Sequence, residues 1–172
     1  MTKMNMVSNI FRKEETKKPA LILDLSFAGQ ISIWGFRLLA SGYRADIDMT
    51  KMLIDGFRRC NAVQAGSNLL FLSEIIFSGL IRNIEINCAC NPSLSKDEKI
   101  LVSILNICQK SPSPEFKDHL TDFITHDATN NAVFLFINYT ACLRDAGLML
   151  TEQDNLMPKI INNESQISSI LH

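Results

Sequence analysis

Apolar residues recur along most of this chain at steps of three and four, the spacing that places side chains on one face of an α-helix. The first such segment runs from Leu21 to Leu39, and Gly42 follows it at a position typical of a helix end. A second segment begins after Asp46 and ends at Arg58 and Arg59, where positive charge favours a helix C-terminus. The pattern therefore predicts two successive helices.

A third segment, from Val63 to Ile81, is apolar nearly all round and carries Glu74 as its one charge. A helix of this kind is usually buried on every side, so we expect it at the centre of the fold. It has no Arg or Lys before Arg82, which excludes it as the recognition helix of a helix-turn-helix motif.

The pattern changes between residues 84 and 90. Ile84, Ile86, Cys88 and Cys90 alternate with other residues at a period of two, which indicates an extended segment. This alternation predicts that the four side chains share one buried side of the chain.

Local signals mark three further helices. Ser95 and Glu98 form a capping box at the start of a fourth helix, which runs through Cys108. Ser113, followed by a proline, predicts the start of a short fifth helix. A sixth follows Asp127 and ends at Gly147.

Together these segments predict an all-α, single-domain bundle of five or six helices, with one short extended segment near residues 84–90. We expect a tail over residues 1–19, the helical domain over 20–150, and a C-terminal segment over 151–172 that docks. It docks either on its own domain, where we favour the groove beside the sixth helix, or on a second copy or a partner. That segment is rich in Asn and carries apolar residues: Leu156, Ile160, Ile161, Ile167, Ile170 and Leu171.

Composition narrows the function classes. The 172 residues are 47% apolar and 20% charged, as in globular proteins, and 17 Lys and Arg nearly balance 18 Asp and Glu. The balance gives no field that would attract nucleic acid. The longest uncharged stretch, Ala128 to Leu143, is too short and too polar to span a membrane, and we find no secretory signal. We therefore expect a cytoplasmic protein.

The five cysteines are the first place to look for chemistry. Cys88 and Cys90 could begin a zinc or redox site, but their spacing differs from the C-x-x-C of structural zinc sites. An odd number of cysteines in irregular positions argues for free thiols, so we expect all five to be reduced and mostly unreactive. The residues that could complete a site with the pair are Cys60, Cys108, Cys142, His119 and His126.

Other candidates have simpler explanations. His126 and Asp127 could form a catalytic dyad, but adjacent residues near a helix start more often serve the cap. Asp46 and Asp48 could join Asp55 in a cation site, but a helix N-terminus also attracts such charges. The sequence therefore predicts no catalytic residue, no cofactor and no metal.

Three short motifs carry a resemblance to a family. They are Trp34 with Arg37, the run Leu94-Ser95 with Asp97-Glu98, and Leu143 with the run Ala146 to Leu148. Over roughly residues 30 to 150 the chain resembles small, uncharacterised all-helical proteins of alphaproteobacteria. The resemblance implies a bacterial helical domain and assigns no activity. Independently, the spacing of Trp34 from Ile31 and Leu38 predicts a core anchor on the first helix.

Two functions follow from these observations. The first is a non-enzymatic helical protein-interaction module, binding a protein partner or a second copy of itself, because apolar residues lie on both sides of the helical unit. The alternative is a ligand-binding or enzymatic helical domain whose site is assembled only in three dimensions. A deep pocket lined by Arg37, Glu74 or His126 would favour the alternative.

Overall fold

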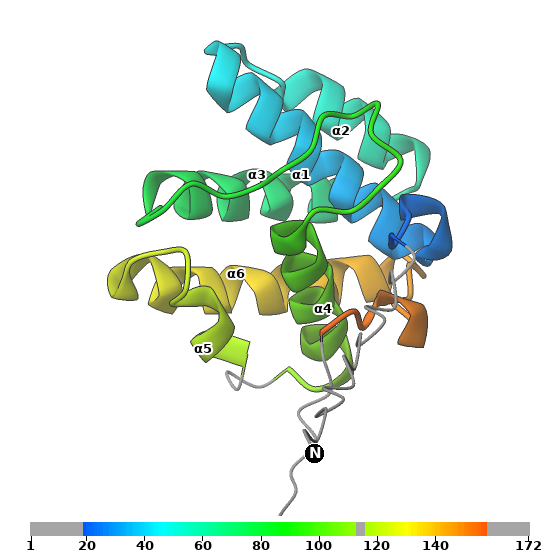
Figure 1. The fold of residues 1–172 in the computed structure, drawn as a ribbon. Coiled ribbons are helices and arrows are strands. Elements are labelled where there is room, and N and C mark those ends of the chain that lie inside the picture. Colours follow the sequence, from blue (N-terminus) through cyan, green and yellow to red (C-terminus); the bar gives the residue numbers. More distant parts are fainter. Residues whose placement is uncertain (1–18, 113–115, 158–172) are drawn as a thin grey trace, which may run out of the picture.

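A computed structural model describes residues 19–112 and 116–157. Within these residues the chain is all-α, with six α-helices and two 3-10 turns (Figure 1). The helices are α1 (Phe27–Ala45), α2 (Thr50–Arg59), α3 (Val63–Ser78), α4 (Lys96–Lys110), α5 (Lys117–Leu120) and α6 (His126–Asp145); the turns are η1 (Ile22–Asp24) and η3 (Glu152–Asp154). The predicted all-α fold is confirmed.

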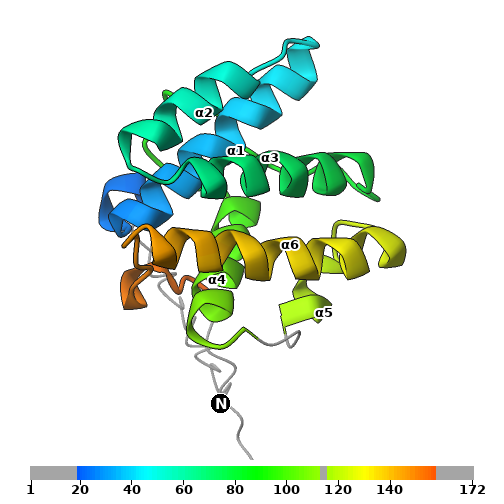
Figure 2. The same cartoon turned by 180° about the vertical axis from the view of Figure 1, so that it is seen from behind.

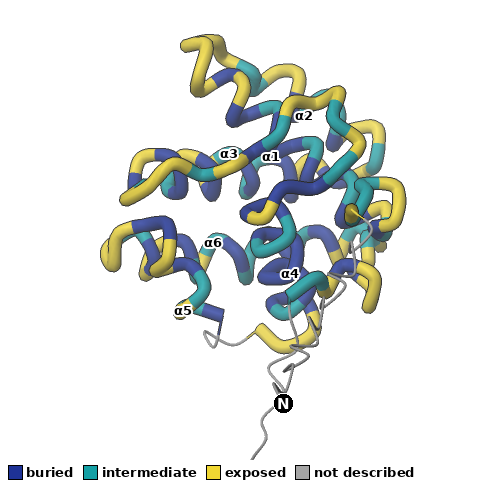
Figure 3. The backbone as a smooth tube through the Cα atoms, in the orientation of Figure 1, coloured by how far each residue is buried: buried dark blue, intermediate teal, exposed yellow. Residues whose placement is uncertain are grey.

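α3 and α6 form the middle of the domain. They run antiparallel beside each other, and a β-bridge between Leu80 and Ile124 joins the end of α3 to the start of α6. α1 and α2 pack on one side of this pair, as Figures 1 and 2 show from opposite directions. α4 crosses behind α6 in Figure 2 and is buried along most of its length (Figure 3).

The first predicted helix divides into two elements. The chain turns through η1 and then starts again at α1, where the Ser26 hydroxyl caps the helix by accepting from Gly29 N at 3.1 Å. Gly42 does not end α1, which continues to Ala45 and closes at Asp46 in the left-handed conformation. The start assigned to Asp46 is therefore wrong, and α2 begins at Thr50.

Of the two predicted ends of α6, the start lies at a different residue and the stop is confirmed. Thr125, not Asp127, caps its start by accepting a hydrogen bond from Ala128 N, because Asp127 already lies inside the first turn. At the other end Gly147 has φ +76°, and Leu148 N donates to Leu143 O across it. A residue without a side chain adopts this conformation without steric cost, so Gly147 is the helix stop that the sequence indicates.

Trp34 lies at the edge of the core and is half-buried rather than enclosed. Its ring packs on α2 at Gly56, where an added Cβ would come within 2.4 Å of the indole. Phe57 supports it from the same helix, with 6.4 Å between ring centroids. Trp34 therefore anchors α1 to α2 and still presents part of its ring to the surface.

Residues 148–157 dock on α4. Three buried polar side chains at every third position of that helix, Ser103, Asn106 and Gln109, bond the backbone of this segment. Leu156 N donates to Ser103 Oγ at 2.8 Å, and its side chain packs against the core. The apolar positions Ile160, Ile161, Ile167, Ile170 and Leu171, the tail over 1–18, and Ser113 with Pro114 lie outside the described residues.

Among the described helices, none combines the length and the apolar character that crossing a membrane requires.

Candidate functional site: the loop of residues 80–95

The buried guanidinium of Arg37 holds the loop between α3 and α4 in place. It makes two parallel bonds with the carboxylate of Glu98, Nε to Oε1 at 2.7 Å and Nη2 to Oε2 at 2.9 Å. Its other donors reach three loop carbonyls: those of Cys88 at 3.1 Å, Asn91 at 2.5 Å and Ser93 at 2.7 Å. All five N–H groups of Arg37 are thereby used.

Glu98 completes the clamp from the start of α4. Besides Arg37, its carboxylate accepts from the backbone N–H of Asn87 at 3.1 Å and of Ser95 at 2.9 Å. The second bond is half of the capping box with Ser95, which the structure confirms. The carboxylate of Glu98 thus binds the end of the loop, caps the start of α4 and neutralises Arg37. Because the two charges neutralise each other, the buried charge of Arg37 is tolerated.

A second ion pair fixes the other end of the loop. Asp97 accepts two bonds from Arg82, at 2.9 and 2.7 Å, and one from Glu85 N at 2.7 Å. The hydrogen bonds from Arg82 hold the pKa of the Asp97 carboxyl below its usual range, although burial acts in the opposite direction. Arg44 adds a bond to Ile86 O at 2.9 Å.

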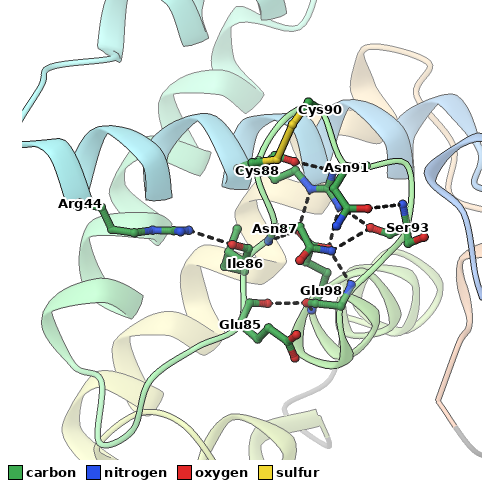
Figure 4. Close-up of polar contacts among 11 residues, drawn as sticks. Arg44, Glu85, Ile86, Asn87, Cys88, Cys90, Asn91, Ser93 and Glu98 are labelled. Carbon is green, nitrogen blue, oxygen red and sulfur yellow. Dashed lines mark hydrogen bonds and ion pairs between the residues drawn. A yellow bond between two sulfur atoms is a disulfide. The ribbon is translucent and has the colours of Figure 1, made fainter.

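The loop carries an exposed pair of cysteines at its apex. Cys88 and Cys90 form a disulfide bond with one residue between them and 5.4 Å between their Cα atoms. Figure 4 shows the pair beyond the polar contacts of Asn87, Asn91 and Ser93. Both cysteines are exposed, so the predicted reduced and buried state is wrong for this pair.

The alternation that suggested burial holds only for part of the segment. Ile86 is buried and Ile84 half-buried, as a period of two requires, but Asn91 N then donates to Cys88 O at 3.1 Å and closes a turn. A turn reverses the chain and carries Cys88 and Cys90 away from the core. The segment near 84–90 is extended at its start, and the described residues contain no sheet that it could join.

An apolar groove of about 360 Å³ lies beside this turn, and we name it the Trp34 groove. The walls come from η1, α1, α2 and the loop, and Phe27 is 57% exposed. Ala89, between the two cysteines, forms part of the rim. The lining residues that matter here are Ile22, Phe27, Ile31, Trp34, Gly56 and Ala89.

Backbone bonds couple the loop to the opposite wall of the Trp34 groove. Ile22 N donates to Pro92 O at 2.9 Å, and Leu94 N donates to Ala20 O at 2.9 Å, around a bridge between Leu21 and Ser93. The loop and η1 therefore form one continuous rim.

The other candidate site residues from the sequence are not brought together into one site. His126 and Asp127 are exposed on α6, with 3.9 Å between Nδ1 and Oδ1, and neither they nor Glu74 line the Trp34 groove. Asp48 accepts from Thr50 N at the start of α2, whereas Asp55 binds Lys51 and Arg58. His119 lies half-buried on the short helix α5.

The three remaining cysteines are free. Cys108 is buried in α4, and burial raises the pKa of its thiol far above the usual range, which keeps it protonated and unreactive. Cys60 and Cys142 are half-buried. Across the residues that the structure describes, no group of three His, Cys, Asp or Glu side chains is arranged to hold a metal ion.

Comparison with known proteins adds no relative. No protein-family model matches the chain, and searches of curated proteins and of solved structures found no match either.

Proposed function

We propose that this chain is a helical protein-interaction module that binds an apolar stretch of a partner polypeptide in the Trp34 groove. The observation that carries the proposal is the half-buried tryptophan in a cavity of about 360 Å³, flanked by the largely exposed ring of Phe27. Tryptophan is the residue type most often found at energetic centres of protein interfaces, especially where apolar neighbours exclude water.

The chemistry of the groove favours an apolar side chain over a charged ligand. Arg37 touches the lining, but each of its N–H groups is already bonded to the loop or to Glu98. Gln30 donates its amide to Leu25 O at 2.9 Å. Little unused hydrogen-bonding capacity remains, so burial of apolar surface supplies the binding energy.

The wider setting is part of the same proposal. The odd number of cysteines, five, supports a cytoplasmic location. The balanced charges, 17 positive and 18 negative, support the absence of a nucleic-acid role. The resemblance to helical proteins of alphaproteobacteria supports a bacterial source.

Trp34 provides a direct test, because it is the only tryptophan in the chain. The full-length protein is titrated with a synthetic decapeptide carrying leucine and phenylalanine at its centre, and Trp34 emission is followed. We expect a saturable blue shift, since the bound peptide removes water from the indole. The same decapeptide with serines at both positions should leave the emission unchanged.

Two phenylalanine variants make the test specific to the groove. Phe27→Ser should weaken binding about tenfold, equivalent to about 1.4 kcal/mol. Phe71→Ser is the matched control: Phe71 is 55% exposed on α3 and does not line the groove. A flat titration, or equal losses in both variants, would contradict the proposal. Trp34 emission could instead shift with protein concentration in the absence of peptide, with dimers forming in sedimentation. The partner that binds in the groove would then be a second copy of this chain.

A further inference from the structure

The disulfide at the loop apex is unusual for a structural cross-link. Cys88 and Cys90 enclose a single residue, and the stabilisation a disulfide gives by restricting the unfolded chain becomes small as the enclosed loop shortens. Both cysteines are exposed, whereas a cross-link that only supports the fold needs no access to solvent.

The loop is also held without the sulfur atoms. Arg37 binds three of its carbonyls, Asn87 donates its amide to Ser93 O at 2.9 Å, and Asn91 accepts from Ser93 N at 2.9 Å. None of these bonds involves a cysteine side chain. Opening the disulfide therefore leaves the turn in place, with two thiols beside each other on a rigid support.

The position of the pair points to a substrate. Ala89, the residue that the disulfide encloses, lines the Trp34 groove, so the pair is adjacent in the chain to an apolar surface suited to a polypeptide. In reducing compartments, the disulfides that do occur are usually transient and serve catalysis or redox sensing. Exposure, a preformed turn and an adjacent apolar surface are the features that such a site requires.

We propose that Cys88 and Cys90 form a redox-active pair that exchanges with a dithiol of a polypeptide held in the Trp34 groove. The exchange itself goes beyond the interaction role, whereas the reducing compartment and the choice of a polypeptide rest on the proposed function. The cysteine pair and the Trp34 groove come together only in the folded chain, so this site is assembled in three dimensions.

The reaction is a transfer of two electrons. A thiolate of the polypeptide attacks one sulfur of the pair, forming a mixed disulfide while the Cys88–Cys90 bond breaks and the departing thiolate takes up a proton. The second thiolate of the polypeptide then attacks the sulfur of the polypeptide's first cysteine in the mixed disulfide, and the second thiolate of the pair leaves and takes up a proton. The polypeptide is oxidised to a disulfide, Cys88 and Cys90 are reduced, and the two protons they gain equal those that the polypeptide loses.

The first experiment tests the redox pair alone. The full-length protein is equilibrated in mixtures of reduced and oxidised dithiothreitol, and the state of each cysteine is read by alkylation and peptide mass spectrometry. We expect Cys88 and Cys90 to convert together and reversibly while the helical circular dichroism signal stays constant. Loss of the fold on reduction would show a structural cross-link and overturn the proposal, as would a pair that never reoxidises or that retains zinc at one equivalent.

The second experiment tests the substrate. The oxidised protein is mixed with a reduced decapeptide that has two cysteines between a leucine and a phenylalanine, and oxidation of the peptide is followed. We expect at least tenfold faster exchange than with the peptide whose leucine and phenylalanine are serine. Cys88→Ser and Cys90→Ser should each abolish peptide oxidation, because neither variant can form the disulfide that the exchange consumes.

Cys142→Ser is the matched control and should exchange at the rate of the unmodified protein. With these controls, failure of the redox proposal can be distinguished from failure of the proposed polypeptide groove. No exchange with dithiothreitol or either peptide overturns the redox pair, and equal rates with both peptides overturn the polypeptide groove as its substrate site.

Discussion

Arg37 and Glu98 form an ion pair that is buried in the domain. The side chain of Arg37 is 1% exposed and that of Glu98 is fully buried. Removing two charges from water costs several kcal/mol per ion, and this cost is offset only when the geometry is good and every remaining polar atom is bonded. Both conditions are met, because the fork of the guanidinium fits the carboxylate and the remaining donors reach loop carbonyls.

We therefore expect Arg37→Met to lower the free energy of unfolding by about 3 to 5 kcal/mol, since Glu98 would be left buried without its counter-charge. Urea denaturation followed by circular dichroism measures the loss. Arg37→Lys should lose less, because it keeps the charge but not the fork. Arg44→Met is the control: it removes an exposed donor to Ile86 O and should cost about 1 kcal/mol. Equal effects of all three variants would contradict the clamp.

Sequence patterns could not find this pair. Arg37 and Glu98 are 61 residues apart, and each has a local explanation, Arg37 as a helical residue and Glu98 as part of a capping box. Trp34 was predicted as a core anchor because its spacing from Ile31 and Leu38 is helical, which is correct for its helix. Spacing alone cannot tell that the indole packs against Gly56 of α2 and remains half-buried.

Two helix boundaries with strong local signals could be predicted from the sequence. The capping box of Ser95 and Glu98 and the stop at Gly147 depend only on residues within a few positions, so the sequence contains the whole signal. The break between η1 and α1 was missed although the Ser26 hydroxyl caps α1 locally through Gly29 N, and a second part of this start is not local. Its cap, Ser26, receives support from Asp154, whose carboxylate accepts from Ser26 N at 3.1 Å across 128 residues.

The row of polar residues on α4 is a sequence pattern that predicts a docked segment. Ser103, Asn106 and Gln109 recur every three residues on a helix that is otherwise apolar there, and all three are buried. A buried polar side chain requires a partner, so such a row indicates a backbone segment running along the helix. Gln109 illustrates it by donating to Leu148 O at 3.0 Å and accepting from Leu150 N at 2.7 Å.

A chain cut after Thr151 keeps the partners of Gln109 but loses Asp154 and Leu156, with their bonds to Ser26 N and Ser103. We expect it to melt on the order of 10 °C below the full-length protein, because roughly 3 kcal/mol of docking is lost and 1 kcal/mol shifts a melting temperature by about 2–4 °C at this size. Differential scanning calorimetry measures the shift. A chain cut after Met157 keeps Asp154 and Leu156 and should melt clearly above the shorter one. If both melted with the full-length protein, docking of residues 152–157 would contribute nothing.

Although positive and negative charges nearly balance over the whole chain, its carboxylates differ in how far they are exposed to solvent. Asp97 is 4% exposed in its ion pair, whereas Asp127 lies fully in solvent. The pKa of Asp97 lies below its ordinary value of 3.8, chiefly through the hydrogen bonds from Arg82. A group of this kind stabilises the fold above its unfolded pKa, and its contribution disappears as pH falls through the folded value.

The free energy of unfolding should therefore be nearly constant above about pH 5 and should decrease as pH falls below about 4. Urea denaturation at a series of pH values checks this. Asp97→Asn and Arg82→Gln should each reduce stability at neutral pH and flatten the decrease in acid, because each removes the pair that depends on an ionised carboxylate. An unchanged slope in both variants would assign the acid sensitivity to other carboxylates.

The bond between Ser26 N and Asp154 also has a consequence for biosynthesis. A ribosome makes residue 26 long before residue 154, so the first turn of α1 is produced without one of the acceptors that completes it. Until Asp154 has left the exit tunnel, the nascent chain holds α1 with an incomplete start and the buried row of α4 without its backbone partners. A chain whose translation stalls before that residue therefore presents polar groups and apolar surface together, which is the combination that chaperones and proteases act on.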